Sequence, residues 1–277
     1  MTRVDVLIPT CDRPAALAVT LTGLAGQTFR DIRIVVADQT ERADVFAVPE
    51  VAAVLRVLRH QRLEVETHRH LPRRGVGENR QFLLDRARAA YAWCLDDDVL
   101  CEPDLLARLV RHLDAQRCGF VGCPVTGLTH LDDVRPHQQH LELWTGPVRP
   151  EAIGPDAPEV DRHHLHSAAN MVHVAQRLGL GNGREALYKV AWIGGCVLYD
   201  TAKLRAVGGF EFWRELPREH CGEDVLAQWR VMARFGGAGL LPSGAHHLQL
   251  PTTLPNRRAD APRLLPVDEA RARGLPA

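Results

Sequence analysis

Three consecutive aspartates, Asp96–Asp98, directly follow the apolar run at residues 91–95. Neighbouring carboxylates repel one another, so such a group needs a cation or a solvated loop around it. Asp96 and Asp98 are two positions apart and point to the same side of an extended segment. Two hard oxygen ligands on one side suit Mg²⁺ or Mn²⁺, which also take ligands from water and from a substrate phosphate. The alternative is a solvated acidic turn in which Asp97 or Asp98 caps the next helix.

Glu223 and Asp224 form a second acidic pair, at the start of an amphipathic helical pattern. A carboxylate within hydrogen-bond reach of a hydroxyl group can accept its proton and act as a general base. The N–H groups at a helix start would lower the basicity of Asp224, and burial under Trp213 or Trp229 would offset that effect. The alternative is that the pair only stabilises the N-terminus of the helix.

Histidines and tryptophans supply further side chains that could bind a ligand. A dense histidine group resembles a zinc site at first sight, but it lacks cysteine partners and regular spacing, so we expect these residues at the surface or in a substrate cleft. Each of three tryptophans could stack on a sugar ring, although packing in the core is the default role of this residue. The residues in question are His163, His164, His166 and His173, and Trp144, Trp192 and Trp213.

Other familiar motifs are absent or incomplete. The sequence GLGNG at residues 179–183 follows an expected helix instead of a strand, so it is not a dinucleotide fingerprint. No Walker A sequence occurs. Cys11 has no pattern of histidine and asparagine partners that would mark it as a nucleophile.

The elements that position these residues alternate between strand and helix in the first half of the chain. Short runs rich in β-branched residues predict strands, and apolar residues three or four positions apart predict helices. Asp12 can cap the first helix, and Pro14 fits its first turn. Strands are expected at 4–8, 32–37, 63–67 (nearer a sheet edge), 91–95 and 120–123, and helices from Pro14 to Gly26, around 51–58, at 78–90 and from Pro103.

This alternation predicts an α/β fold with a mostly parallel sheet that helices cover on both faces. Ligands bind such sheets outside the carboxyl ends of the strands. Thr10, Asp38 and Asp96–Asp98 all lie at the ends of predicted strands. We therefore expect them to converge on one crevice.

The second half of the chain is less regular. Residues 126–189 are rich in His, Pro and Gly and are expected to be irregular or partly helical. A strand-like run resumes at 190–199, broken by Gly194 and Gly195. A helix is expected at 224–235 with Leu226, Trp229 and Ala233 among its inward positions. The proline-rich segment from Pro251 onward is expected to be a loosely packed extension.

The composition is that of an ordinary globular protein, with 277 residues, 45% of them hydrophobic and 25% charged. Lys and Arg together number 34, as do Asp and Glu, so a general electrostatic attraction to nucleic acid is not expected. Seven scattered cysteines without CxxC spacing are typical of reduced thiols in the cytoplasm. Asp5 lies within the first apolar run, which argues against a secretory signal. The uncharged run at 190–199 is half of the roughly 20 residues that a membrane helix needs, so a soluble protein without a transmembrane segment is expected.

Five sequence blocks together resemble family 2 glycosyltransferases, which have the GT-A fold. Each block is weak alone, but they occur in the order of that family, and a DxD-type motif ends the fourth predicted strand. They span most of the chain. The blocks are VDVLIPTCDRP (Val4–Pro14), IVVADQTE (Ile34–Glu41), GVGENRQFLLDRARAAYAWCLDDDV (Gly75–Val99), GGCVLYDTAKLRAVGGFEFW (Gly194–Trp213) and GEDVLAQWRV (Gly222–Val231).

The resemblance implies a role for each matching position. The turn after the first strand passes the nucleotide, and Asp38 contacts the base or ribose, although ADQT stands here where many members have DDGS. Asp96 and Asp98 match the DxD carboxylates, and His246 or His247 stands where a third metal ligand is often found, with His246 favoured. Asp224 matches the general base of the family's ED pair, with Glu223 beside it. The implied nucleotide-sugar-binding residues are Pro9, Thr10, Asp12, Arg13, Asp38, Asn79, Arg80, Asp96 and Asp97.

The resemblance implies a metal-dependent glycosyltransferase of the hexosyltransferase type. It would use Mn²⁺ or Mg²⁺ to move a sugar from a UDP- or GDP-sugar to a hydroxyl of a sugar, lipid, natural product or peptide, with inversion. Residues 1–125 would bind the donor, 126–250 would form the acceptor-binding and catalytic half of the same domain, and 251–277 would be an extension.

Three alternatives remain at this point. The first is a retaining GT-A transferase, which the ED pair does not exclude. The second is a sugar-phosphate nucleotidylyltransferase, whose glycine-rich first loop is missing because the first strand ends in PTCDRP. The third is a non-catalytic sugar-binding relative, which the presence of DDD, ED and a late histidine disfavours.

Overall fold

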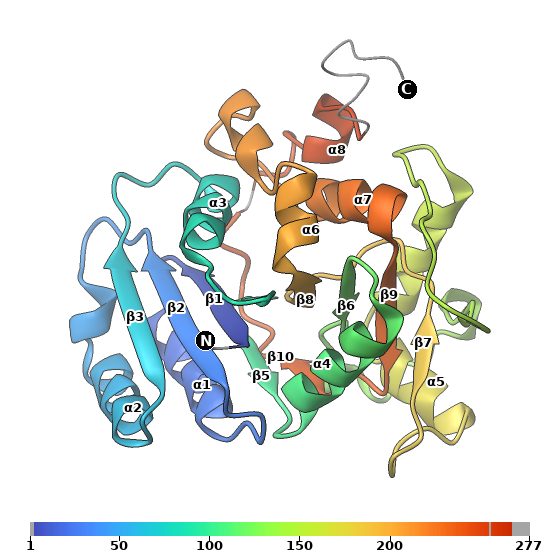
Figure 1. The fold of residues 1–277 in the computed structure, drawn as a ribbon, viewed down its shortest axis with the longest axis horizontal. Helices are drawn as coiled ribbons and strands as arrows, with labels where there is room; N and C mark the ends of the chain where they lie inside the picture. Colours follow the sequence, from blue (N-terminus) through green and yellow to red (C-terminus); the bar gives the residue numbers. More distant parts are fainter. Residues whose placement is uncertain (1–2, 255, 268–277) are drawn as a thin grey trace.

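The computed structural model describes residues 3–254 and 256–267. Within these residues, eight strands form one sheet in the order β3-β2-β1-β4-β8-β6-β9-β7, and a two-stranded sheet pairs β10 with β5 (Figure 1). The strands are β1 (Val4–Thr10), β2 (Ile32–Asp38), β3 (Glu64–Arg69), β4 (Tyr91–Leu95), β5 (Val99–Cys101), β6 (Phe120–Gly122), β7 (Ala186–Tyr188), β8 (Cys196–Asp200), β9 (Gly237–Leu241) and β10 (Ala245–His247).

Helices lie on both faces of the large sheet (Figure 1). The α-helices are α1 (Pro14–Ala25), α2 (Pro49–His60), α3 (Val76–Arg86), α4 (Leu105–Gln116), α5 (Asn170–Arg177), α6 (Thr201–Ala206), α7 (Glu223–Phe235) and α8 (Ala261–Leu264). Short 3₁₀ helices are η1 (Val45–Ala47), η2 (Leu128–His130), η3 (Pro136–Gln138), η4 (Pro158–His166) and η5 (Glu211–Glu215).

The first half of the sheet is parallel, and the second half is mixed. Strands β3, β2, β1 and β4 pair in parallel, as do β6 and β9. Strand β8 runs antiparallel to both β4 and β6, and β7 runs antiparallel to β9. Within the large sheet of the described residues, four pairings are therefore parallel and three are antiparallel, which confirms the expected α/β fold with a mostly parallel sheet. The edge position expected for the third strand is also confirmed, because β3 ends the sheet.

Alternating side chains of the strands build two hydrophobic cores. Val4, Val6 and Ile8 of β1 pack with α1, α2 and α4 on one face. Leu7 of β1 packs on the other face, with α3, α6 and α7. Strands buried on both faces read as continuous apolar runs, which is why β1 and β2 were recognisable in the sequence.

Several local expectations are wrong. Asp12 does not cap α1, because the N-cap is Arg13 and no side chain bonds the helix start. The strand expected at 190–199 is only Cys196–Asp200, since positive φ at Gly195 breaks the run. Ala233 of α7 is exposed instead of inward. The helix expected at 78–90 is α3, which ends at Arg86.

The expectation of a loosely packed segment after Pro251 is also wrong for the part that the structure describes. The N–H of Cys221 donates to the carbonyl of Ala259, and the N–H of Ala261 donates to the carbonyl of Cys221, both at 2.9 Å. Ala261 is fully buried, and α8 packs on α7. Residues 268–277 of the expected extension lie outside the described residues.

A buried ion pair joins β1 to β2 and accounts for the charge within the first apolar run. Asp5 and Arg33 are register partners, and both Arg33 Nε and Nη2 donate to the Asp5 carboxylate, at 2.8 and 2.9 Å. Both side chains are 1% exposed. Burial raises the pKa of Asp5, but the bonds from Arg33 and from the N–H groups of Ala89 and Arg88 outweigh it, so the pKa lies below its usual value.

Asp5→Ala is expected to lower the free energy of unfolding by about 3 kcal/mol, because it leaves the buried Arg33 without the carboxylate that accepts hydrogen bonds from its Nε and Nη2 atoms. Urea denaturation at pH 7 measures the loss. Asp31→Ala, an exposed aspartate at the start of β2, is the matched control and should change stability by less than about 0.5 kcal/mol. Because the folded pKa of Asp5 is depressed, its contribution should fade as pH falls below about 4. Equal stability of the two variants would contradict this account.

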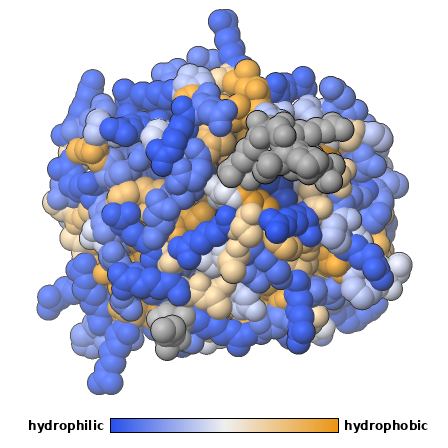
Figure 2. Space-filling view, turned by 45° about the horizontal axis from the view of Figure 1, so that its top comes forward, coloured by the Kyte–Doolittle hydropathy of each residue, from blue (hydrophilic) through white to orange (hydrophobic). Residues whose placement is uncertain are grey.

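The face of the molecule in Figure 2 is mostly hydrophilic, with hydrophobic residues between the polar ones near its centre. Among the described residues, no helix is both long and apolar enough to cross a membrane.

Candidate functional site

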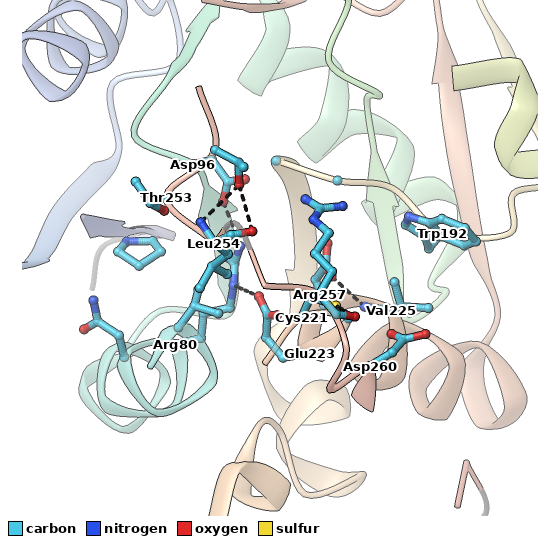
Figure 3. Close-up of a pocket in the computed structure, with 18 of the residues that line it drawn as sticks. Arg80, Asp96, Trp192, Cys221, Glu223, Val225, Thr253, Leu254, Arg257 and Asp260 are labelled. Carbon is cyan, nitrogen blue, oxygen red and sulfur yellow. Dashed lines mark hydrogen bonds and ion pairs between the residues drawn. The ribbon is translucent and has the colours of Figure 1, made fainter. Parts of the chain in front are cut away.

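A cleft of about 840 Å³ opens where β1 and β4 end, next to the start of α7. Pro9 and Thr10 come from the end of β1, Asp96–Asp98 follow β4, and Glu223 and Asp224 begin α7. Gly194 and Gly195 precede β8, which is antiparallel to β4 and so begins at the same edge. Polar loops and a helix start therefore converge there, as expected for a sheet of this kind. Figure 3 shows the cleft.

Asp96, Asp97 and Asp98 form an acidic loop between β4 and β5, and Asp97 is its middle residue. Its carboxylate accepts a hydrogen bond from the Thr10 hydroxyl at 2.6 Å, and Arg13 Nη1 lies 3.4 Å from it. Burial raises the pKa of Asp97 to about 7, against the lowering effect of Thr10, and the neighbouring Asp98 raises it further. Asp97 thus holds the loop against β1.

Asp98 faces an arginine and a histidine. Arg13 Nη1 lies 2.5 Å and His247 Nε2 3.4 Å from its Oδ2 atom. Burial raises the pKa of Asp98, but His247 and Arg13 together lower it below its usual value. The hydrogen bond to Asp98 raises the pKa of His247 in turn. This carboxylate is therefore ionised and held in one position at neutral pH.

Arg80 of α3 connects the two acidic groups of the cleft (Figure 3). Its Nη2 atom lies 2.7 Å from Asp96 Oδ1, and its Nε atom lies 3.0 Å from Glu223 Oε1. Burial lowers the pKa of Arg80, but Asp96 and Glu223 outweigh it and raise the pKa well above the usual value. Arg80 is thus a permanent cation that fixes the acidic loop relative to the start of α7.

Asp224, in the first turn of α7, has a pKa raised toward neutrality. Burial raises its pKa to about 7. The charges of Glu223 and Asp96 also raise this pKa, whereas the charge of Arg80 lowers it. The N–H of Val225 donates to Asp224 Oδ1 at 2.9 Å. Trp229 lines the cleft nearby, whereas Trp213 does not. A carboxylate that ionises near pH 7 suits a general base.

The end of β2 places its polar groups behind the cleft wall. Asp38 is fully buried, and Gln39 is the residue that lines the cleft at this point. The N–H of Thr40 donates to Asp38 Oδ1, but Asp38 Oδ2 and Asn79 Oδ1 accept no hydrogen bond from any described residue. Of these two residues, Asn79 lines the cleft, and its unpaired oxygen suits a ligand that carries an N–H or O–H group.

The structure brings most of the expected site residues together and leaves three out. Those that line the cleft are Pro9, Thr10, Arg13, Asn79, Arg80, Asp96, Asp97, Asp98, Glu223, Asp224 and His247. Asp38 lies behind the cleft wall. Asp12 is not part of the lining, and its exposed side chain lies 3.7 Å from Arg73. The geometry favours His247 over the expected His246, because His246 Nε2 lies 3.0 Å from Glu102 and His247 is the one at Asp98. Adjacent residues of β10 point to opposite sides, so the two histidines cannot share a site.

Several cleft residues were not expected from the sequence. They come from the loop after β2, from the loop before α3, from the loop before α7 and from the segment after β10. The last group includes Leu250, Thr252, Thr253, Leu254, Arg257, Asp260, Pro262 and Arg263, and the others include Gln39, Arg73 and Cys221. Arg13 also donates to the carbonyl of Pro251, so the last segment is tied to the acidic loop.

The chemistry of Asp98 and His247 fits a divalent cation of the Mn²⁺ or Mg²⁺ type. A carboxylate oxygen and an imidazole nitrogen 3.4 Å apart, both at the cleft wall, can serve as neighbouring ligands of one ion. Asp96 is partly exposed, with 36% of its side chain accessible, and is open to a ligand on the same side. Residues 3–254 and 256–267 contain no group of three or more His, Cys, Asp or Glu side chains arranged as metal ligands.

Comparison with known proteins gives a family and a fold. Residues 5–179, more than half of the chain, match Glycosyl transferase family 2. No curated protein matches the sequence. Among solved structures, S. aureus TarS 1–349 in complex with UDP-GlcNAc superposes with a TM-score of 0.54 and 12% identity, over 91% of this chain and 60% of that one.

A second solved structure is the mannosyltransferase PcManGT from Pyrobaculum calidifontis in complex with GDP-Man and Mn²⁺. Its TM-score is 0.51 at 17% identity, over 85% of this chain and 53% of that one. The chain thus spans little more than half the length of these two structures, and at such identity the likeness concerns the fold alone. The fold and the match over residues 5–179 agree with the motifs and confirm the resemblance: the chain belongs to glycosyl transferase family 2, with the GT-A fold.

Proposed function

We propose that the protein transfers a sugar from a nucleoside-diphosphate sugar to an acceptor hydroxyl group, with a divalent cation and with inversion of the anomeric carbon. The observation that carries this proposal is that one cleft is lined both by the Asp96–Asp98 loop and by Asp224. The first can hold a diphosphate through a cation, and the second can accept a proton. Inversion needs these two functions on opposite sides of the transferred sugar.

The donor is a UDP- or GDP-sugar. Support comes from the two relatives in fold, one solved with UDP-GlcNAc and the other with GDP-Man and Mn²⁺. The unpaired acceptor Asn79 Oδ1, in the lining of the cleft, provides a place for an N–H or O–H group of the nucleoside. A hexose is accordingly the transferred group.

Asp98 and His247 would hold the cation, with Asp96 beside them. When bound, such an ion neutralises the charge that develops on the departing diphosphate. Arg13 contacts Asp98 and keeps that carboxylate ionised and in position. Glu223 is a positioning residue, since it acts through Arg80.

Asp224 takes the proton in the transfer step. The acceptor oxygen forms a bond to the anomeric carbon while the bond from that carbon to the diphosphate oxygen breaks. The electron pair of the broken bond leaves with the diphosphate, and the hydroxyl proton passes to Asp224. A carboxylate with a pKa of about 7 is a strong enough base to take part and is regenerated in water at neutral pH.

Titration calorimetry with UDP and GDP, with and without Mn²⁺, tests the donor and the metal together. The proposal expects one nucleotide to bind much more tightly with Mn²⁺. Proton NMR of the product then reads the anomeric configuration. Failure of both nucleotides to bind would overturn the proposal, and retained configuration would favour the retaining alternative.

His247→Ala is expected to weaken Mn²⁺ binding in the presence of the nucleotide by at least about tenfold, because it removes a ligand at Asp98. His246→Ala is a closely matched control, since it removes the neighbouring imidazole that faces Glu102, and it should leave Mn²⁺ affinity unchanged. Calorimetric titration of Mn²⁺ into each variant measures the difference. If neither substitution alters the affinity, the cation is held by the acidic loop and the phosphates without a histidine.

A further inference from the structure

We propose that the acceptor is itself a sugar, and that its ring packs against Trp192 in a subsite formed by Trp192, Val225 and Asp260. The proposal rests on the function proposed above and adds the chemical class of the acceptor. It starts from the three tryptophans that could stack on a sugar. Of these, Trp192 lines the cleft, whereas Trp144 packs against a hydrophobic core and Trp213 lies outside the lining.

Trp192 is held as a flat wall of the cleft. The ring of His163, from η4, stacks on it with centroids 5.0 Å apart and an angle of 13° between the planes. Val160 of the same 3₁₀ helix also lines the cleft. A rigid aromatic surface at a cleft wall matches the apolar C–H face of a sugar ring and loses little conformational entropy on binding.

The subsite adjoins the proposed base. Val225 lines the cleft and follows Asp224 directly, and its N–H group bonds the Asp224 carboxylate. In Figure 3, Trp192, Val225 and Asp260 are drawn on one side, and Arg80 and Asp96 on the other. A ring seated against Trp192 would therefore present its hydroxyl groups toward the side of the cleft that holds Asp224.

Asp260 supplies a second carboxylate beside α7. Its Oδ1 atom lies so close to Gly222 that a Cβ atom there would be only 2.3 Å from it, and Gly222 also has a φ of +73°. Carboxylate oxygens accept hydrogen bonds, so Asp224 and Asp260 can each accept one from a hydroxyl or amine group of a ligand. Arg263 Nε lies 3.5 Å from Asp260 and neutralises part of its charge.

This combination favours a sugar over the other acceptors of the same reaction. An alkyl chain would bury carboxylates without donors, which costs free energy. A sugar ring offers both an apolar face for Trp192 and several O–H donors for the two carboxylates.

Saturation-transfer NMR with methyl glycosides tests the subsite directly. The probes are the methyl pyranosides of glucose, galactose, mannose and N-acetylglucosamine, in the presence of Mg²⁺ and UDP or GDP. At least one should bind, about tenfold more weakly to Trp192→Ala and with nearly natural affinity to Trp192→Phe. Trp213→Ala, which removes a tryptophan outside the cleft lining, is the matched control and should bind the glycoside as the natural sequence does.

Nucleotide calorimetry on the same variants separates this proposal from the function on which it rests. Unchanged nucleotide affinity in Trp192→Ala together with lost glycoside binding supports the subsite. Nucleotide binding without any glycoside binding, or with equal glycoside binding in Trp192→Ala, overturns the subsite and leaves the transferase function standing. Trp192-dependent glycoside binding without nucleotide binding would support the sugar subsite and overturn the transferase function. Transfer to a peptide or lipid acceptor without glycoside binding would also contradict the proposal.

Discussion

An Asp224→Asn variant is expected to transfer sugar at least about 10²-fold more slowly than the natural sequence while binding the donor nucleotide with unchanged affinity. The amide has nearly the same size as the carboxylate and can still accept the N–H bond of Val225. It cannot take a proton from the acceptor hydroxyl. The loss should therefore appear in kcat and not in the nucleotide Kd, as measured by product formation under saturating donor and by calorimetry.

The pH dependence gives a second measure of the same group. Burial and the charges of Glu223 and Asp96 raise the pKa of Asp224 to about 7, against the opposing effect of Arg80. A base must be ionised to act, so transfer by the natural sequence should fall as pH drops below about 7. The residual activity of Asp224→Asn should not show this fall below about pH 7. Glu219→Gln, an exposed carboxylate shortly before α7, is the control and should keep both the rate and the profile. A rate near that of the natural sequence in Asp224→Asn would exclude this base.

Asp98→Ala is expected to abolish the enhancement of nucleotide binding by Mn²⁺, which corresponds to a loss of at least about 10²-fold in nucleotide affinity with the metal present. The substitution removes the carboxylate that faces both Arg13 and His247. Binding in the absence of metal should change much less, because it does not depend on the cation. Calorimetry with and without Mn²⁺ separates the two effects.

Two further variants make the Asp98 result interpretable. Asp98→Asn keeps the volume and an oxygen atom but lacks the charge, so it should show the same loss if the charge binds the cation. Asp104→Ala removes an exposed aspartate that precedes α4 and should bind nucleotide like the natural sequence. Melting curves check that the fold persists in all three. Metal-dependent binding that persists in both Asp98 variants would show that Asp98 is not a ligand.

Much of the fold could be predicted because its signals are local. The buried strands β1, β2 and β4 are short apolar runs, each followed at once by a polar residue, and parallel strands bring those endings to one edge. Thr10 and Asp96–Asp98 could be assigned to one cleft for that reason. The family motifs added Asn79, Arg80, Glu223 and Asp224, which also line it.

The features that could not be predicted from the sequence depend on contacts between distant segments. The choice between His246 and His247 is set by the register of β10 on β5, where His247 pairs with Val99 and His246 with Leu100, and three-residue strands carry no alternating pattern to reveal it. The backbone of Asp12 has a φ of +58°, and none of the neighbouring residues predicts this conformation. The segment after Pro251 has the composition of a loose tail, yet its path is fixed by backbone bonds to Cys221 and by a bond from Arg13.

The path of that final segment has a consequence for the order in which the protein acquires its binding cleft during synthesis. The ribosome makes Asp96–Asp98 and helix α7 first, and the cleft residues from Leu250 to Arg263 emerge after all the others that line the cleft. A nascent chain that has already formed all eight strands of the large sheet therefore still has a cleft without its last wall. The last wall of the cleft is therefore added only after the segments that form the large sheet have been made.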